Sequence, residues 1–271
     1  MRQRAFNYNN RIWGTGTEST SFKSWGSLKL RFLFKNMPSH SKKILEIGCG
    51  GGKFSRAVNL KFPKSEVYGV DLSSLSLRYA RSQKSNIIYK RMNGEKLAFK
   101  EATFDCVYLI DVLEHVENPQ RVLNEVSRVL KPKGVCVSMT PIEGSRLLLY
   151  SILRKIVRDD LKERQLGHIN HFTKNGLITL HENSGLILSN TQYSFHILSQ
   201  IFDILLSLVR TKASAGNSFT FESYVGEKKG LWGRILGALY SCIVVITNLE
   251  SYVLGRFILG QTLFVVSQKE Q

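Results

Sequence analysis

The chain has few cysteines, which argues against two kinds of site, and few acidic residues, which leaves it basic. Its cysteines stand singly among apolar neighbours without a C-x-x-C pair, which argues against a disulfide framework and a zinc site; they are Cys49, Cys106, Cys136 and Cys242. The first residues lack the apolar core of a secretory signal. We therefore expect a protein of the reducing cytoplasm, built on one main domain.

The shortage of acids leaves a basic chain, because 21 Asp and Glu stand against 38 Lys and Arg, a formal net charge of +17 at pH 7. Residues 1–43 hold nine of the basic residues and a single acid, Glu18. The electrostatic field of such a positive charge attracts anionic partners, which include nucleic acid, anionic lipid and phosphorylated metabolites. The alternative is a solvated basic face without a partner.

Short aliphatic segments alternate with helical stretches from Lys43 onward, as in a parallel sheet with crossover helices. The pattern predicts strands at 43–47, 66–70, 87–91, 104–110 and 134–139. The clearest helix is 118–130, with an apolar stripe at helical spacing and a stop signal at Lys131-Pro132-Lys133-Gly134. We expect a doubly wound α/β core.

The segments around this core divide the chain further. A basic amphipathic helix at 24–36 is expected to cover the pocket, and a charged helix is expected at 146–164. Thr173 is expected to cap a helix at 174–184, followed by strands at 186–194 and 262–267. Two apolar runs, 196–210 and 231–259, precede the last strand. The predicted units are a basic helical cover at 1–40, a core at 41–195, an apolar helical insertion at 196–260, and the final strand and tail at 261–271.

A glycine-rich turn follows the first predicted strand, in the run Glu46-Ile47-Gly48-Cys49-Gly50-Gly51-Gly52. Such a turn leaves backbone N–H groups free at a helix N-terminus, where a nucleotide or a carboxylate binds. A dinucleotide fingerprint requires a third glycine where this chain has Lys53, which disfavours NAD. The spacing E-x-G-x-G-x-G resembles the first motif of the class I S-adenosylmethionine-dependent methyltransferases.

The resemblance covers roughly residues 40–190 and is strongest to the UbiE/UbiG-like branch (methyltransferase types 11 and 23). It implies S-adenosyl-L-methionine as cofactor and a Rossmann-like, seven-stranded methyltransferase sheet, here with a helical insertion before the last strand. Asp71, which ends the second strand, has two oxygens that match the ribose hydroxyls. Asn93 stands where the family has an Asp that holds the adenine amine. The predicted cofactor-binding residues are Glu46, Gly48, Cys49, Gly50, Gly52, Asp71, Leu72, Asn93, Gly94, Ile110 and Asp111.

Asp111, Glu114 and His115 form a D-x-x-E-H pattern on one helical turn, which is compatible with a divalent cation. Some ubiquinone-pathway O-methyltransferases use E-x-x-E-H for magnesium, but many relatives with the D-V-L-E-H-V string need no metal. We predict no metal and assign these residues to the pocket wall or a helix start.

Two histidines are the candidate catalytic residues, His168 and His171. They lie in Gly167-His168-Ile169-Asn170-His171-Phe172-Thr173, which resembles a G-H-x-x-H-F-T segment of one methyltransferase branch. A neutral imidazole can take a proton from a hydroxyl during methyl transfer. The alternative is that both rings fix the loop through hydrogen bonds to the backbone.

The sequence favours methyl transfer to oxygen of a small or lipid-linked, amphiphilic acceptor. The insertion suits such an acceptor, and with the basic charge it suits peripheral contact with the anionic inner membrane surface. A hydrophobic lid or a dimer interface is the alternative for these helices. A catalytically silent binding subunit and a nucleic-acid methyltransferase are the other functions considered, and the second lacks an N/D-P-P-Y/F motif.

Overall fold

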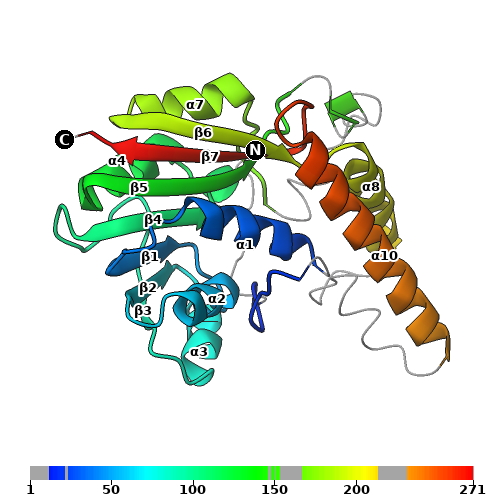
Figure 1. The fold of residues 1–271 in the computed structure, drawn as a ribbon, viewed down its shortest axis with the longest axis horizontal. Coiled ribbons are helices and arrows are strands. Elements are labelled where there is room, and N and C mark those ends of the chain that lie inside the picture. The colour runs from blue at the N-terminus through cyan, green and yellow to red at the C-terminus, as the bar shows by residue number, and fades with distance from the viewer. Residues whose placement is uncertain are drawn as a thin grey trace, which may run out of the picture.

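The computed structural model describes residues 12–21, 24–145, 148–149, 151–152, 167–212 and 231–270. At its centre lies a seven-stranded sheet in the order β3-β2-β1-β4-β5-β7-β6, in which β7 runs antiparallel to its neighbours (Figure 1). The strands are β1 Lys43–Ile47, β2 Glu66–Asp71, β3 Ile88–Arg91, β4 Phe104–Ile110, β5 Leu130–Pro141, β6 Leu186–Ser194 and β7 Thr262–Lys269. The predicted seven-stranded α/β sheet is confirmed.

Helices cover both faces of the sheet and give a three-layer structure (Figure 1). Side chains of a strand alternate between the faces, so Tyr108 packs in one apolar core while Val107 and Leu109 pack in the other. The first core is closed by α1 Trp25–Asn36, α2 Lys53–Lys61 and α3 Ser74–Ser82, and the second by α4 Pro119–Val129 and α7 Lys174–Glu182.

Most predicted element bounds agree with the structure, and β5 is the main exception. It starts at Leu130, directly after α4, rather than at Gly134. The pairing shifts there, from Phe104 opposite Leu130 to Cys106 opposite Val135. The expected stop signal therefore forms a bulge inside the strand, because the bulge absorbs the extra residues without ending the ladder. The helix predicted at 146–164 falls mostly outside the described residues.

The apolar insertion forms two helices between β6 and β7, α8 Ile197–Lys212 and α10 Leu231–Leu254. Figure 1 shows both beyond one end of the sheet, with α10 extending farthest. The two ends of the insertion are held together, because Ser194 pairs with Thr262 across β6 and β7. Helix α10 ends at Leu254, five residues before the apolar run does.

In the described part of the N-terminal cover, the helix is α1, which begins at Trp25 after an N-cap serine, Ser24. The described residues before it run over the glycine-rich turn. The carbonyl of Trp13 accepts a hydrogen bond from the Gly51 amide at 2.6 Å. This segment therefore forms one wall of the pocket described next.

Candidate functional site

A cavity of about 580 Å³ opens at the carboxyl ends of β1, β2 and β4, next to the turns that follow them. Parallel α/β sheets place their ligands at this edge, because helix N-termini and strand-end turns meet there. Helix α1 and both insertion helices complete the wall. The cavity thus has one end built by the sheet and another built by the cover and the insertion.

The glycine-rich turn requires its glycines for steric reasons. Gly48 has φ +72°, and a Cβ there would lie 2.5 Å from Val112 Cγ2. Gly52 has φ +82° and is the N-cap of α2, where a Cβ would overlap the Tyr89 hydroxyl. Left-handed backbone and close approach together leave glycine as the one residue that fits without rearrangement. The backbone amides of the turn are hydrogen-bonded within the protein, for example those of Gly48 and Cys49 to the Val70 carbonyl, which corrects the expectation that they stay free. The glycines instead let the backbone itself form the cavity wall.

Asp71 lies at the end of β2 and lines the cavity. Its two carboxylate oxygens accept one backbone hydrogen bond each, from Gly50 and from Ser73, both at 2.8 Å. Burial raises the pKa of Asp71, and these hydrogen bonds oppose the rise. A carboxylate oxygen can accept more than one hydrogen bond, so the geometry leaves capacity for a diol. The ribose role stays a prediction.

All other predicted cofactor residues line the cavity except Gly52, which is absent from its described wall. Asn93 and Gly94 follow β3, and the Asn93 Oδ1 accepts the Glu95 amide at 2.9 Å, which fixes the turn and leaves one acceptor position on that oxygen. The remaining ones lie around the ends of β1, β2 and β4: Cys49, Gly50, Leu72, Ile110. Their contacts with a cofactor stay predictions.

Glu46 lies beneath the glycine-rich turn and is 2% exposed. Its carboxyl group accepts hydrogen bonds from the hydroxyls of Ser55 and Tyr108, the second at 3.1 Å. Burial raises the pKa of Glu46 to about 8, although both hydrogen bonds oppose the shift. The group is therefore mostly protonated at pH 7 in the free protein.

Asp111 lines the other end of the cavity and has a left-handed backbone conformation, with φ +54°. Its carboxylate forms an ion pair with Lys29 of α1, whose ammonium group also lies 5.7 Å from the Phe195 ring centre. This pairing corrects the cation set considered from the sequence, because the carboxylate of Asp111 is held by a lysine and lies outside the cluster that Glu114 and His115 form.

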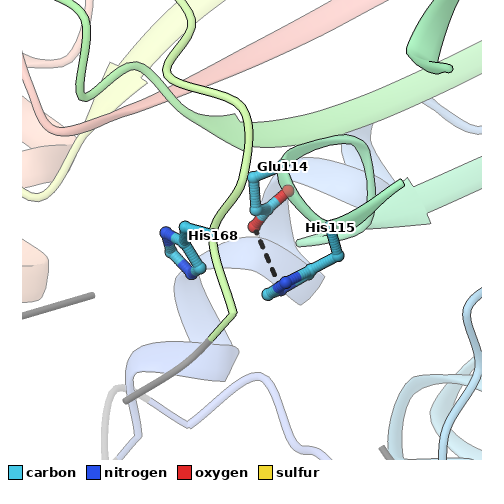
Figure 2. Close-up of side chains that lie close together, drawn as sticks. All are labelled: Glu114, His115 and His168. Atoms are coloured by element: carbon cyan, nitrogen blue, oxygen red, sulfur yellow. Dashed lines mark ion pairs between the residues drawn. The ribbon is translucent and has the colours of Figure 1, made fainter. Parts of the chain in front are cut away.

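That cluster joins Glu114 and His115, from the turn after β4, with His168 from a neighbouring loop (Figure 2). One ligand atom from each lies within 4.8 Å of the others. Among the described residues, no hydrogen-bond donor reaches the Glu114 carboxyl oxygens. Burial raises the pKa of Glu114 well above its usual range and lowers that of His115 to about 4. Burial therefore favours the uncharged forms of both side chains, and the absence of a metal stays a prediction.

His168 is nearly buried, lines the cavity, and is backed by a carboxylate that no sequence motif indicated. Its Nδ1 lies 3.1 Å from Glu143 Oε2. A ring that donates Nδ1–H to a carboxylate keeps its Nε2 lone pair for a proton. His171 reaches the same carboxylate at 3.6 Å but is absent from the described wall of the cavity. The structure thus distinguishes the two candidate histidines.

Three further groups of the wall could not be assigned from the sequence. Lys29 was one of many basic residues of the cover, and Ser199 and Tyr240 lie in the insertion helices. Glu143 had a signal, because it follows β5 by two residues and so lies at the edge of the sheet that carries the other site residues.

Residues 45–138 match the family model of a methyltransferase domain. A ubiquinone biosynthesis O-methyltransferase of Coxiella burnetii (strain RSA 331 / Henzerling II) is 28% identical over 183 residues, which cover 65% of this chain and 77% of that protein. One of the same name from Methylococcus capsulatus is 25% identical over 221 residues, 76% of this chain and 92% of the relative.

Solved structures share the fold at low identity. An S-adenosylmethionine-dependent methyltransferase from Mesorhizobium loti has a TM-score of 0.57 and 19% identity, covering 90% of this chain and 99% of its own. A phosphoethanolamine N-methyltransferase of Haemonchus contortus, solved with phosphomonomethylethanolamine and S-adenosylhomocysteine, has a TM-score of 0.58 and 18% identity over 92% of this chain and 53% of its own.

Proposed function

This chain is a class I S-adenosylmethionine-dependent methyltransferase, and we propose that it transfers the methyl group to a phenolic oxygen of an amphiphilic acceptor. The observation that carries the proposal is His168, which lines the same cavity as Asp71 and the glycine-rich turn and has Glu143 beside its Nδ1. The O-methyltransferase relatives support oxygen as the receiving atom.

The cofactor supplies a methyl group on a sulfonium, which is already a good leaving group, so the protein chiefly aligns the acceptor and excludes water. The glycine-rich turn and Asp71 are proposed to hold the cofactor. The cover and insertion enclose the acceptor end through Trp25, Phe195 and Tyr240. Aromatic walls of this kind suit an apolar or aromatic acceptor.

A base at the acceptor end indicates an oxygen acceptor, because a hydroxyl is a weak nucleophile until its proton is removed. A neutral amine, in contrast, can attack the methyl carbon before it loses a proton. His168 is the proposed base, and its Nδ1 contact with Glu143 supports this role because the carboxylate would fix the ring. A phenol has a pKa of about 10, like the tyrosine side chain, so an imidazole base can help to remove its proton. An alkyl alcohol is far less acidic.

The acceptor class is tested with a matched pair of probes, a long-chain alkylcatechol and an alkylaniline with the same chain. Methyl-labelled S-adenosylmethionine is supplied, and mass spectrometry locates the label. We expect a methyl ether from the catechol and little product from the aniline. Efficient N-methylation of the aniline, with no ether from the catechol, would overturn the proposal.

Glu46 gives a prediction for the pH dependence of cofactor affinity. The cationic cofactor favours the ionised carboxylate, so its binding lowers the pKa from about 8 and releases a proton. We therefore expect affinity to rise with pH up to about 8 and then to level off. In Glu46→Gln this rise should disappear, as calorimetry at several pH values would show.

The stability of the free protein is the control for this variant. In the unfolded chain Glu46 has the ordinary glutamate pKa of 4.5, whereas the folded group stays protonated to about 8. The wild type therefore loses stability as pH rises between these values, and Glu46→Gln should have an equal or higher Tm at pH 8. A pH dependence that is the same in both proteins would assign it to another group.

A further inference from the structure

Helix α10 is amphipathic in the reverse sense to a helix of a water-soluble protein. Its buried face carries Thr247, Asn248 and Ser251, each at most 1% exposed. Thr247 accepts from the Trp25 indole at 3.3 Å, the Asn248 amide donates to a backbone carbonyl at the start of α1 at 3.0 Å, and Ser251 accepts from the Phe195 amide at 2.9 Å. Hydrogen bonds, not apolar packing alone, attach this helix to the core.

The opposite face of α10 is apolar and open. The exposed fractions run from 40% to 66% for Ile235, Leu239, Ile246, Leu249, Tyr252 and Val253. A surface helix normally turns its polar stripe to water. Single exposed apolar residues are ordinary, but a contiguous patch marks a binding surface. Residues 237–254 are also long and apolar enough to cross a membrane, with 28% of that stretch buried.

The apolar surface continues onto α8 and onto the turn after α10. Leu198, Ile201 and Leu205 of α8 are exposed, and an apolar groove of about 240 Å³ runs between the helices. Beyond α10, Phe257 is 83% exposed. Among residues 197–258 whose side chains are described, every exposed one is apolar or aromatic except Arg256. We call this surface the α8–α10 face; it lies on the side of the molecule where Figure 1 shows α10 extending past the sheet.

We propose that the α8–α10 face docks on an anionic phospholipid bilayer, with the helices lying in the interface. The formal charge of +17 favours this occupant, because an anionic surface attracts the chain, whereas a second copy brings the same charge and repels it. Spanning would remove the polar face of α10 from its partners on α1, so α10 stays attached to the fold and enters one leaflet.

Docking also brings the reaction cavity to the lipid surface. Ser199 of α8 and Tyr240 of α10 line that cavity, while their helices carry the exposed apolar face. An amphiphilic acceptor could pass from the leaflet to His168 without crossing water. This last step rests on the proposed function, whereas the docking itself does not.

Cosedimentation of the full chain with vesicles tests the docking. Vesicles of equal parts phosphatidylcholine and phosphatidylglycerol are compared with phosphatidylcholine alone. The test variant is Val253→Ser/Phe257→Ser, and the matched control is Leu60→Ser/Ile187→Ser, which removes exposed apolar groups from α2 and β6. We expect anionic vesicles to bind the wild type and the control at least about tenfold more tightly than the test variant.

Salt separates the electrostatic part from the apolar part, because charge attraction is screened over about 8 Å at physiological ionic strength. Added salt should weaken vesicle binding by the wild type. The binding that persists at high salt measures apolar contact, and the test variant should lack it. Equal Tm values show that both variants fold. The proposal is wrong if the wild type ignores anionic vesicles, or if the test variant binds them as the wild type does. It is also wrong if the substitutions abolish a dimer seen by light scattering but leave vesicle binding unchanged.

Discussion

Replacing His168 with Gln is expected to lower kcat by about a hundredfold or more, with cofactor affinity close to that of the wild type. The reason is that His168 lines the cavity and has Nδ1 at 3.1 Å from Glu143 Oε2, so a ring that donates Nδ1–H to this carboxylate keeps its other nitrogen as the proton acceptor. Glutamine keeps a polar group of similar reach but cannot serve as a base. Single-turnover rates with the alkylcatechol probe measure the effect, and calorimetry measures cofactor binding.

His171 supplies the control, because it contacts the same Glu143 carboxylate without lining the described cavity. His171→Gln should keep most of the activity, while Glu143→Gln should lose activity in step with the His168 variant. If a higher pH restores the rate of the His168 variant, the acceptor hydroxyl ionises by itself at that pH and no longer needs the base. This outcome supports the base role. Equal rates for wild type and His168→Gln would remove the base from the mechanism.

Replacing Asp71 with Ala is expected to weaken S-adenosylmethionine binding by about ten- to a hundredfold, which corresponds to roughly 1.5 to 3 kcal/mol for the loss of a charged acceptor. The variant also releases the amides of Gly50 and Ser73, which the carboxylate now holds. Calorimetry gives the affinity directly, and turnover at saturating cofactor should recover in part.

Asp105→Ala is the matched control for this loss of backbone contacts. Its carboxylate accepts the amides of Lys42 and Lys43 at 2.9 and 2.8 Å, as Asp71 accepts two amides, but it lies outside the wall of the cavity. Asp105→Ala should lower Tm without changing cofactor affinity. If both variants lose affinity equally, general loosening of the fold explains the result and Asp71 has no direct role.

The sheet and the cofactor end could be predicted because their signals are local. A β-branched strand followed by Gly48, Gly50 and Gly52 specifies a turn that only glycine can form. Strands β1 and β4 were placed to the residue for the same reason, since burial on both faces gives short continuous apolar runs.

The acceptor end could not be predicted because its contacts join distant segments. Lys29 meets Asp111 across 82 residues, and His168 meets Glu143 across 25. Hydrophobic periodicity carries no information on such pairs. The sequence also could not show that the apolar side of α10 faces outward, because an apolar run has the same pattern whether its apolar side faces the core or the solvent. Only the burial of Asn248 and Ser251 reveals the difference.

Because β6 pairs with β7, the insertion between these strands could be replaced by another one, and with it the acceptor end of the cavity. Ser194 lies opposite Thr262, and the Tyr193 amide donates to the Gly255 carbonyl at 2.7 Å, so the chain leaves and rejoins the sheet at one place. Such a long excursion is an enlarged hairpin loop, and the entropy of closing a loop grows only with the logarithm of its length. Insertions of other lengths and shapes could therefore be grafted between these strands at little cost to the sheet, leaving the glycine-rich turn and Asp71 untouched.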